Sequence, residues 1–291
     1  INGGSSQNIQ ASGNIYVTAD AATGYGFYST NTYTTWSWDG NIEIGTQANG
    51  YAMYADTSYS GECRASGTFR GAIYCGVGGL EGRGMYISGL QICTASPSGY
   101  AFQLADGAYI VVDLVISSSI AVFNVTAGAL LFQGCATIHS NNMKFLTQTG
   151  GKFMFAGMME NIARRLTNST ITGGECVIQS DFVHWGQNYP TDEYLFYVDG
   201  GTLRVEGCRL QNNQTVDGCG VIEYVSGQLI LNGATLVSTA VDVTTFSIKV
   251  VGALDYVGYN DSYANLAIGG GGSLTNLITG GGSIVVDTDV Q

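Results

Sequence analysis

Apolar and polar residues alternate in short blocks along the chain, and a glycine opens each block. Three such blocks run over residues 128–132, 151–155 and 174–178, with apolar residues two and four places after the glycine. This spacing is typical of a β-strand that buries one face. The blocks start 23 residues apart (151 − 128 and 174 − 151). A fixed period of this length predicts a stacked repeat, in which each repeat forms one coil of a parallel β-helix.

The same block recurs over most of the chain and predicts a column of inward-facing pairs: Ile15/Val17, Ile42/Ile44, Cys63/Ala65, Tyr109/Val111, Leu130/Phe132, Phe153/Phe155, Cys176/Ile178, Leu203/Val205, Leu229/Leu231, Leu254/Tyr256 and Ile284/Val286. One further block, with Met85 and Ile87 before Gly89, is shifted by one residue. We therefore predict an all-β fold, a single-stranded right-handed parallel β-helix of about twelve coils.

The continuous repeat predicts one elongated domain over residues 1–291. Within it we distinguish tyrosine-rich coils at 1–60, regular coils at 61–268 and a glycine-rich segment at 269–291. The 43 glycines suit a structure with several tight bends in every coil. Because the chain begins with Ile1 rather than Met, we expect a processed chain or a fragment with further domains on either side.

Charge and cysteine usage exclude several functions. Ten basic and 22 acidic residues give a net charge of −12, whereas binding to nucleic acid or to an anionic membrane needs a basic patch. Membrane insertion is not expected either, because no apolar run approaches about 20 residues. The seven cysteines form no CxxC pair, so we expect small buried thiols, synthesis in a reducing cytosol, and neither metal nor cofactor.

Two aromatic segments are candidates for glycan binding. Trp36 and Trp38 are two residues apart, so both would face the same way from a strand. They would form either a platform for sugar rings or a contact in the core or between subunits.

The second candidate lies where the repeat lengthens to 27 residues (201 − 174). The surplus falls in residues 184–193, and loops that project from a rigid solenoid often carry binding sites. The sugar-binding candidates in this insertion are Trp185, Asn188, Tyr189 and Asp192. A merely solvated loop is the alternative.

Positions three places after each opening glycine should point outward, yet several of them are apolar. A contiguous outward apolar stripe is larger than monomers usually expose, so it predicts association between copies of the chain. The expected interface residues are Ile110, Leu131, Met154, Val177 and Ile230.

The repeated glycine-led blocks resemble the right-handed parallel β-helix proteins, the fold of pectin lyases and phage tailspikes. The resemblance implies a homotrimeric virion protein of the tailspike or tail-fibre type. Such a protein would bind host-surface polysaccharide and contact other virion proteins. It would be made in the host cytoplasm and carried on the virion. A protein of the bacterial surface, or a secreted one, is the alternative location.

Two other functions remain open on the same scaffold. One is a polysaccharide hydrolase or lyase, although the Asn-Thr-Asp, Asp-Asp, Gly-His-Gly and Arg-x-Lys motifs of polygalacturonases are absent. Glycoside hydrolysis needs two facing carboxylates, and nothing singles out a catalytic pair among Glu160, Asp181, Asp192, Glu193, Asp199, Glu206 and Glu223. The other is a purely structural fibre or adhesin shaft.

Overall fold

A computed structural model describes residues 8–18, 24–30, 35–56, 62–76, 84–106, 109–140, 143–161, 166–167, 169–184, 194–213, 220–238, 248–259, 263–269, 273–278 and 282–286. The chain divides into two compact units. Unit 1 comprises residues 1–139 and 151–153, and unit 2 comprises residues 140–150 and 154–291. The single domain expected from the repeat stays a prediction.

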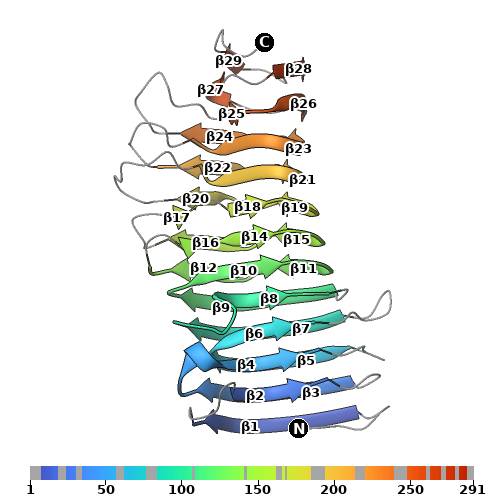
Figure 1. Cartoon of the computed structure of the whole chain (residues 1–291), viewed down its shortest axis with the longest axis vertical. Coiled ribbons are helices and arrows are strands. Elements are labelled where there is room, and N and C mark those ends of the chain that lie inside the picture. Colours follow the sequence, from blue (N-terminus) through green and yellow to red (C-terminus); the bar gives the residue numbers. More distant parts are fainter. Residues whose placement is uncertain are drawn as a thin grey trace. The chain divides into compact units, whose positions relative to one another are not determined.

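Unit 1 is built from parallel strands and one short 3₁₀ helix: β1 (Asn8–Val17), β2 (Gly24–Ser29), β3 (Thr35–Ile44), η1 (Gln47–Asn49), β4 (Gly50–Ala55), β5 (Cys63–Arg70), β6 (Ala72–Cys75), β7 (Gly84–Cys93), β8 (Tyr100–Leu104), β9 (Tyr109–Ser118), β10 (Ala121–Val125), β11 (Ala129–Phe132) and β12 (Cys135–Ile138). The strands β1, β3, β5, β7 and β9 pair in that order, and β2, β4, β6, β8 and β10 form a second ladder (Figure 1). Ile15 pairs with Ile42 and Cys63 with Met85, so a turn takes 27 or 22 residues (42 − 15 and 85 − 63).

A column of glycines bends the long strands of unit 1. Gly13, Gly40, Gly67 and Gly89 lie in register on β1, β3, β5 and β7, and their φ angles are between 116° and 145°. Residues with a Cβ rarely adopt this backbone conformation. A Cβ added at Gly67 would lie 1.9 Å from the carbonyl oxygen of Gly40 in the preceding turn. Glycine is therefore required here both for the bend and for the close stacking of turns.

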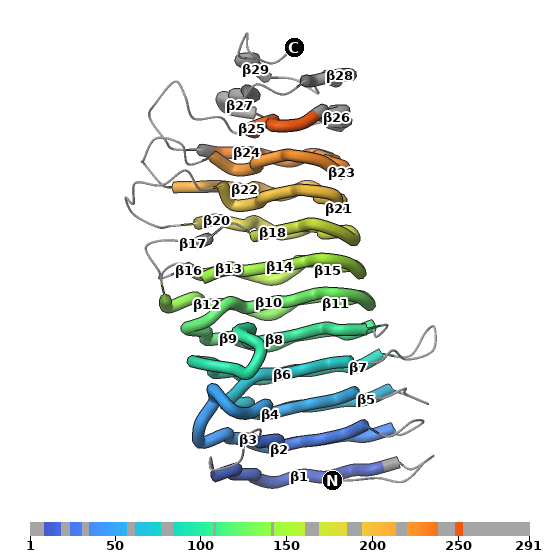
Figure 2. Tube along the Cα trace, in the orientation of Figure 1, coloured from blue at the N-terminus to red at the C-terminus, as the bar shows by residue number. Residues whose placement is uncertain are grey.

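Unit 2 continues with parallel strands: β13 (Met143–Lys144), β14 (Leu146–Gln148), β16 (Met158–Asn161), β17 (Leu166–Thr167), β18 (Ser169–Ile171), β19 (Glu175–Ile178), β20 (Phe182–His184), β21 (Phe196–Glu206), β22 (Arg209–Asn212), β23 (Ile222–Asn232), β24 (Thr235–Ser238), β25 (Ile248–Val250), β26 (Ala253–Tyr259), β27 (Tyr263–Gly269), β28 (Ser273–Ile278) and β29 (Gly282–Val286). The boundary between the units crosses β15 (Lys152–Phe155). The long strand β21 pairs with β18 through its first half and with β19 through its second half. A separate ladder joins β20, β22 and β24 (Figure 2).

Apolar side chains fill the interior of each unit in columns. In unit 1 the rings of Phe102, Phe123 and Phe132 follow one another at centroid distances of 6.0 and 5.0 Å. In unit 2 the rings of Phe182 and Phe196 lie 5.1 Å apart. All five rings are fully buried or nearly so, and each contributes roughly 1.5–3 kcal/mol to folding through its removal from water.

Most of the predicted inward pairs are confirmed within the described residues. Both members are buried in Ile42/Ile44, Cys63/Ala65, Met85/Ile87, Leu130/Phe132, Phe153/Phe155, Cys176/Ile178, Leu203/Val205 and Leu229/Leu231. The prediction for β9 is wrong by one residue. Tyr109 is 45% exposed there, whereas Ile110, Val112 and Leu114 are fully buried. Both faces of β9 are apolar, so alternation alone did not define its register.

The structure is an all-β parallel solenoid with almost no helix. Its described residues support about seven turns rather than the twelve coils predicted. The handedness of the coil and the homotrimer remain predictions.

The cysteines are free thiols and most of them are buried, as predicted, for the six that the structure describes. Cys63, Cys75, Cys93, Cys176 and Cys208 are buried, and Cys135 is half-buried. Burial raises the pKa of Cys63 to about 12 and has the same effect on Cys93 and Cys208. These thiols are therefore poor nucleophiles in the folded protein.

We predict that Gly67→Ala destabilises unit 1 far more than Gly13→Ala. Both changes place a side chain at positive φ, which costs about 1–3 kcal/mol. Only Gly67→Ala also drives a Cβ into the preceding turn, since nothing lies within 4 Å of a Cβ at Gly13. Urea unfolding of the two variants measures the difference. Equal losses of stability would contradict the stacking constraint.

We also predict that the described thiols of the native protein react slowly with a thiol reagent at neutral pH, with Cys135 labelled before the five buried ones. The reason is that the five buried thiols are shielded and remain protonated. Peptide mass mapping after timed labelling gives the order, and labelling in denaturant provides the reference for complete reaction. Rapid labelling of Cys63 in the folded protein would refute the burial described here.

Candidate functional site

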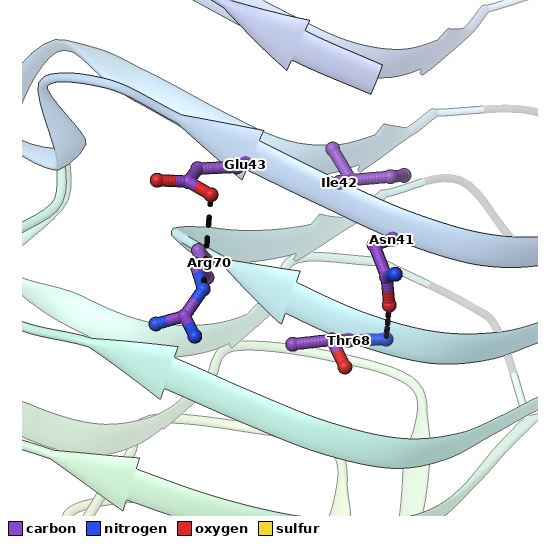
Figure 3. A pocket seen from close by; sticks show the side chains of 5 residues that line it. All are labelled: Asn41, Ile42, Glu43, Thr68 and Arg70. Carbon is purple, nitrogen blue, oxygen red and sulfur yellow. Dashed lines mark hydrogen bonds and ion pairs between the residues drawn. The ribbon is translucent and has the colours of Figure 1, made fainter. Parts of the chain in front are cut away.

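A polar hollow opens on the outer surface of unit 1, directly after the glycine bends of β3 and β5. Its volume is about 200 Å³, and Figure 3 shows the residues that line it: Asn41, Ile42, Glu43, Thr68 and Arg70. The bends at Gly40 and Gly67 immediately precede these residues in the two strands. Polar side chains of several kinds gather around this cavity.

Strand alternation directs the polar side chains into the hollow. Ile42 and Phe69 pair across β3 and β5, and both side chains are fully buried in the core. Asn41 and Glu43 flank Ile42, while Thr68 and Arg70 flank Phe69, so these four face outward. The same apolar positions that stabilise the core therefore also orient the site.

Asn41 is held by hydrogen bonds to the turns on both sides. Its side-chain nitrogen donates to Oδ1 of Asn14 at 2.9 Å, and its Oδ1 accepts from the backbone nitrogen of Thr68 at 3.2 Å. The amide thus has a fixed orientation before any ligand arrives. An amide nitrogen has a second hydrogen and an amide oxygen a second lone pair. Asn41 can therefore both donate to and accept from a ligand hydroxyl.

Glu43 and Arg70 form the opposite side of the hollow. Arg70 Nε lies 3.8 Å from Glu43 Oε2, and the side chains are 44% and 49% exposed respectively. This separation is longer than a hydrogen bond, and an exposed pair of this kind contributes at most about 1 kcal/mol. The pair is consequently a weak structural contact. Both the carboxylate of Glu43 and the guanidinium of Arg70 can still form hydrogen bonds to a ligand.

Tyr16 places an exposed aromatic ring on the neighbouring strand β1, next to Glu43 but not among the residues that line the hollow. It pairs in register with Glu43 and is 65% exposed. A Cβ added at Gly45 would lie 3.1 Å from the Tyr16 hydroxyl oxygen, so the phenol extends over Gly45, two residues after Glu43 in the chain. The ring offers an apolar surface and a hydroxyl together.

A second aromatic surface of unit 1 consists of five tyrosines on β2, β4 and β6: Tyr25, Tyr28, Tyr51, Tyr54 and Tyr74. The ring of Tyr54 lies 5.5 Å from Tyr28 and 4.4 Å from Tyr74, and both contacts are stacked. A bulge between β4 and β6 turns Tyr51 and Tyr54 to the same face, although they are three residues apart. Burial raises the pKa of Tyr51 and Tyr74. The cluster stabilises the outer face, and only Tyr25 and Tyr28, each 38% exposed, present much ring surface to solvent.

The tryptophans expected to bind glycan in the first coils lie in the core instead. Trp36 is 1% exposed and Trp38 is 4% exposed. Their rings pack against Phe27 at centroid distances of 4.6 and 6.4 Å. Neither indole has a face open to a sugar. The alternative of a core contact is therefore correct for both, because β3 turns these two positions inward together with Ile42.

The insertion candidates Trp185, Asn188, Tyr189 and Asp192 lie outside the described residues. Their role in glycan binding stays a prediction. His184, the last residue of β20, is fully buried, and burial lowers its pKa to about 4. This histidine is therefore a neutral core residue at physiological pH.

The predicted interface stripe is only partly at the surface. Leu131, Met154 and Ile230 are half-buried, as outward positions can be, whereas Ile110 is fully buried because of the register of β9. Val177 is 3% exposed. Arg204 pairs with Val177 in register on the neighbouring strand, and its Nε lies 3.1 Å from Glu175 Oε1.

Two other arrangements were candidates for catalysis. Ser117 Oγ lies 2.9 Å from Nε2 of His139, but this exposed pair has no third group orienting the imidazole among the described residues. It is a hydrogen bond between turns and not a catalytic triad. Of the seven carboxylates considered for glycoside hydrolysis, Asp192 and Glu193 lie outside the described residues. Three of the other five are paired with cations: Glu206 with Arg204, Asp181 with Arg209, and Glu223 with Lys249.

The residues of the hollow were not identified from the sequence, although a signal was present. Gly13-Asn14-Ile15 and Gly40-Asn41-Ile42 repeat the same tripeptide 27 residues apart (40 − 13). In a parallel stack such a repeat places equivalent polar side chains directly above one another. A search for recurring outward amides, rather than for tryptophans, would have found Asn14 and Asn41.

Within the described part of the chain, no three His, Cys, Asp or Glu side chains gather so that they could hold a metal ion. No helix there is long and apolar enough to cross a membrane. No protein-family model, curated protein or solved structure shows significant similarity to the chain.

Proposed function

We propose that this protein binds host-surface glycan through the hollow on β3 and β5 and serves as a receptor-binding virion protein of a bacteriophage. The observation that carries the proposal is the set of side chains around one cavity. An oriented amide, a hydroxyl, a carboxylate and a guanidinium surround it, and the exposed phenol of Tyr16 lies next to Glu43 on the neighbouring strand. Sugars present hydroxyls that donate and accept, together with an apolar ring face, and this set matches both.

The virion assignment comes from the resemblance of the repeat to tailspikes and tail fibres. The parallel solenoid and the low proportion of charged residues, 11%, are consistent with it. A rigid stack of turns holds surface side chains at fixed spacings, which suits a multivalent contact with a repeating polysaccharide. Contact with other virion proteins and a location on the particle are parts of the same proposal.

The test of glycan binding uses paired arginine variants. We expect Arg70→Ala to weaken retention on host cells or on immobilised surface saccharide about tenfold, since a hydrogen bond to a charged group contributes roughly 1.5–3 kcal/mol. Arg64→Ala is the matched control. It removes an exposed arginine of the same strand whose partner is Glu62, outside the hollow.

Asn41→Ala should weaken retention as well, with a loss of stability near 1 kcal/mol because two hydrogen bonds between turns disappear. Biolayer interferometry and thermal unfolding separate the two effects. Equal retention by the wild type, Arg70→Ala and Arg64→Ala would exclude the hollow as the binding site.

We also propose a right-handed, tailspike-like homotrimer. The half-buried apolar residues Leu131, Met154 and Ile230 support association. Met154→Lys should shift the assembly toward monomer in light scattering at micromolar concentration, because a charge would be buried without a partner. Met158→Lys is the control, since Met158 is 58% exposed and lies outside the stripe. A monomeric wild type would refute the assembly.

A further inference from the structure

The proposed glycan site has a balance of charge that restricts the kind of sugar it accepts. We infer that the hollow recognises an uncharged sugar residue through two neighbouring hydroxyls that bridge Glu43 and Arg70, and that it discriminates against acidic saccharides. This inference rests on the proposed function and specifies its ligand class.

The charges around the hollow are balanced. Glu43 and Arg70 are the charged residues that line the hollow, and together they carry no net charge. A carboxylate or sulfate on a sugar would meet Arg70, whose charge is already balanced by Glu43 at 3.8 Å. The chain as a whole carries −12, so the long-range field also repels an anionic polymer.

The ion pair of Glu43 and Arg70 is too long to be a hydrogen bond. A normal N–H···O bond is about 2.7–3.2 Å long, whereas Arg70 Nε and Glu43 Oε2 are 3.8 Å apart. Both groups are about half exposed and can form further hydrogen bonds without breaking a good one. A carboxylate only accepts and a guanidinium only donates. Two adjacent hydroxyls, one donating to Glu43 and one accepting from Arg70, satisfy both groups at once.

Asn41 and Thr68 provide the remaining contacts of the hollow. The fixed amide of Asn41 faces the same cavity, and Thr68 supplies a hydroxyl (Figure 3). Tyr16 lies outside the hollow on the neighbouring strand, in register with Glu43 and with most of its ring exposed. Its phenol therefore offers an apolar surface to the adjoining sugar residue of a polymer. A volume of about 200 Å³ suits one sugar residue of a longer polymer, because pockets that bury a whole drug-sized ligand measure about 300–1,000 Å³.

The experiment compares immobilised neutral polysaccharides (mannan, galactan and dextran) with acidic ones (polygalacturonate and polysialic acid). We expect the full chain to be retained on at least one neutral polymer and not on the acidic ones. Retention should change less than about twofold between about 0.1 M and 1 M NaCl, although the Debye length falls from about 10 Å to about 3 Å. Neutral recognition by hydrogen bonds and stacking is not screened by salt.

Two isosteric variants test the charge balance. Glu43→Gln should weaken neutral binding about tenfold and introduce salt-sensitive binding of acidic polymers, because Arg70 loses its counter-charge. Arg70→Gln should weaken neutral binding without any gain for acidic polymers. Glu62→Gln, which releases Arg64 outside the hollow in the same way, is the control and should leave both bindings unchanged.

The outcomes separate the two proposals. Stronger retention of the wild type on acidic than on neutral polymers would overturn the inference and leave glycan binding standing. Unchanged selectivity in Glu43→Gln would also overturn it, provided that circular dichroism shows an intact fold. Retention on none of the polymers would overturn both the inference and the proposed function.

Discussion

The close approach of successive turns at the glycine column is the constraint on which unit 1 depends. At Gly40, Gly67 and Gly89 an added Cβ would lie about 2 Å from backbone atoms of the preceding turn, so no other residue fits there without moving the stack. The positive φ angles at the same positions bend each long strand. One residue type thus fixes both the spacing between turns and the direction of the chain within a turn.

The bend also creates the candidate site. After each of these glycines the strand resumes its alternation, with Ile42 and Phe69 directed into the core and their neighbours directed outward. Because the turns are in register, outward side chains from consecutive turns become neighbours although they are 27 residues apart in sequence (68 − 41). The hydrogen bonds between Asn14, Asn41 and Thr68 follow directly from this stacking.

The sequence predicted the fold class better than the site, for physical reasons. The alternation around Leu130 and Phe132 defines a strand with one buried face, and its repetition defines a parallel stack. β9 was misplaced by one residue because apolar side chains occupy both of its faces. Trp36 and Trp38 were candidates for binding because indoles stack on sugars, but the same apolar surface favours burial. The spacing of two residues shows that both side chains lie on the same face of the strand, but it does not show whether that face is the core or the solvent.

The rule that stabilises the stack also determines the chemistry of its surface. In a parallel stack, equivalent side chains of successive turns are neighbours, so repeated charges of one sign would repel one another. The column before the glycine bends avoids this repulsion by alternation: Ser12, Asp39, Ser66, Ser88 and Asp113. Tyr16, Glu43 and Arg70 also occupy equivalent positions in successive turns, and no two neighbours among them carry charges of the same sign. The charges of Glu43 and Arg70 are balanced between adjacent turns, so the hollow itself has no net charge although the whole chain carries −12. We propose that this local balance favours ligands that offer hydroxyls over ligands that offer charge.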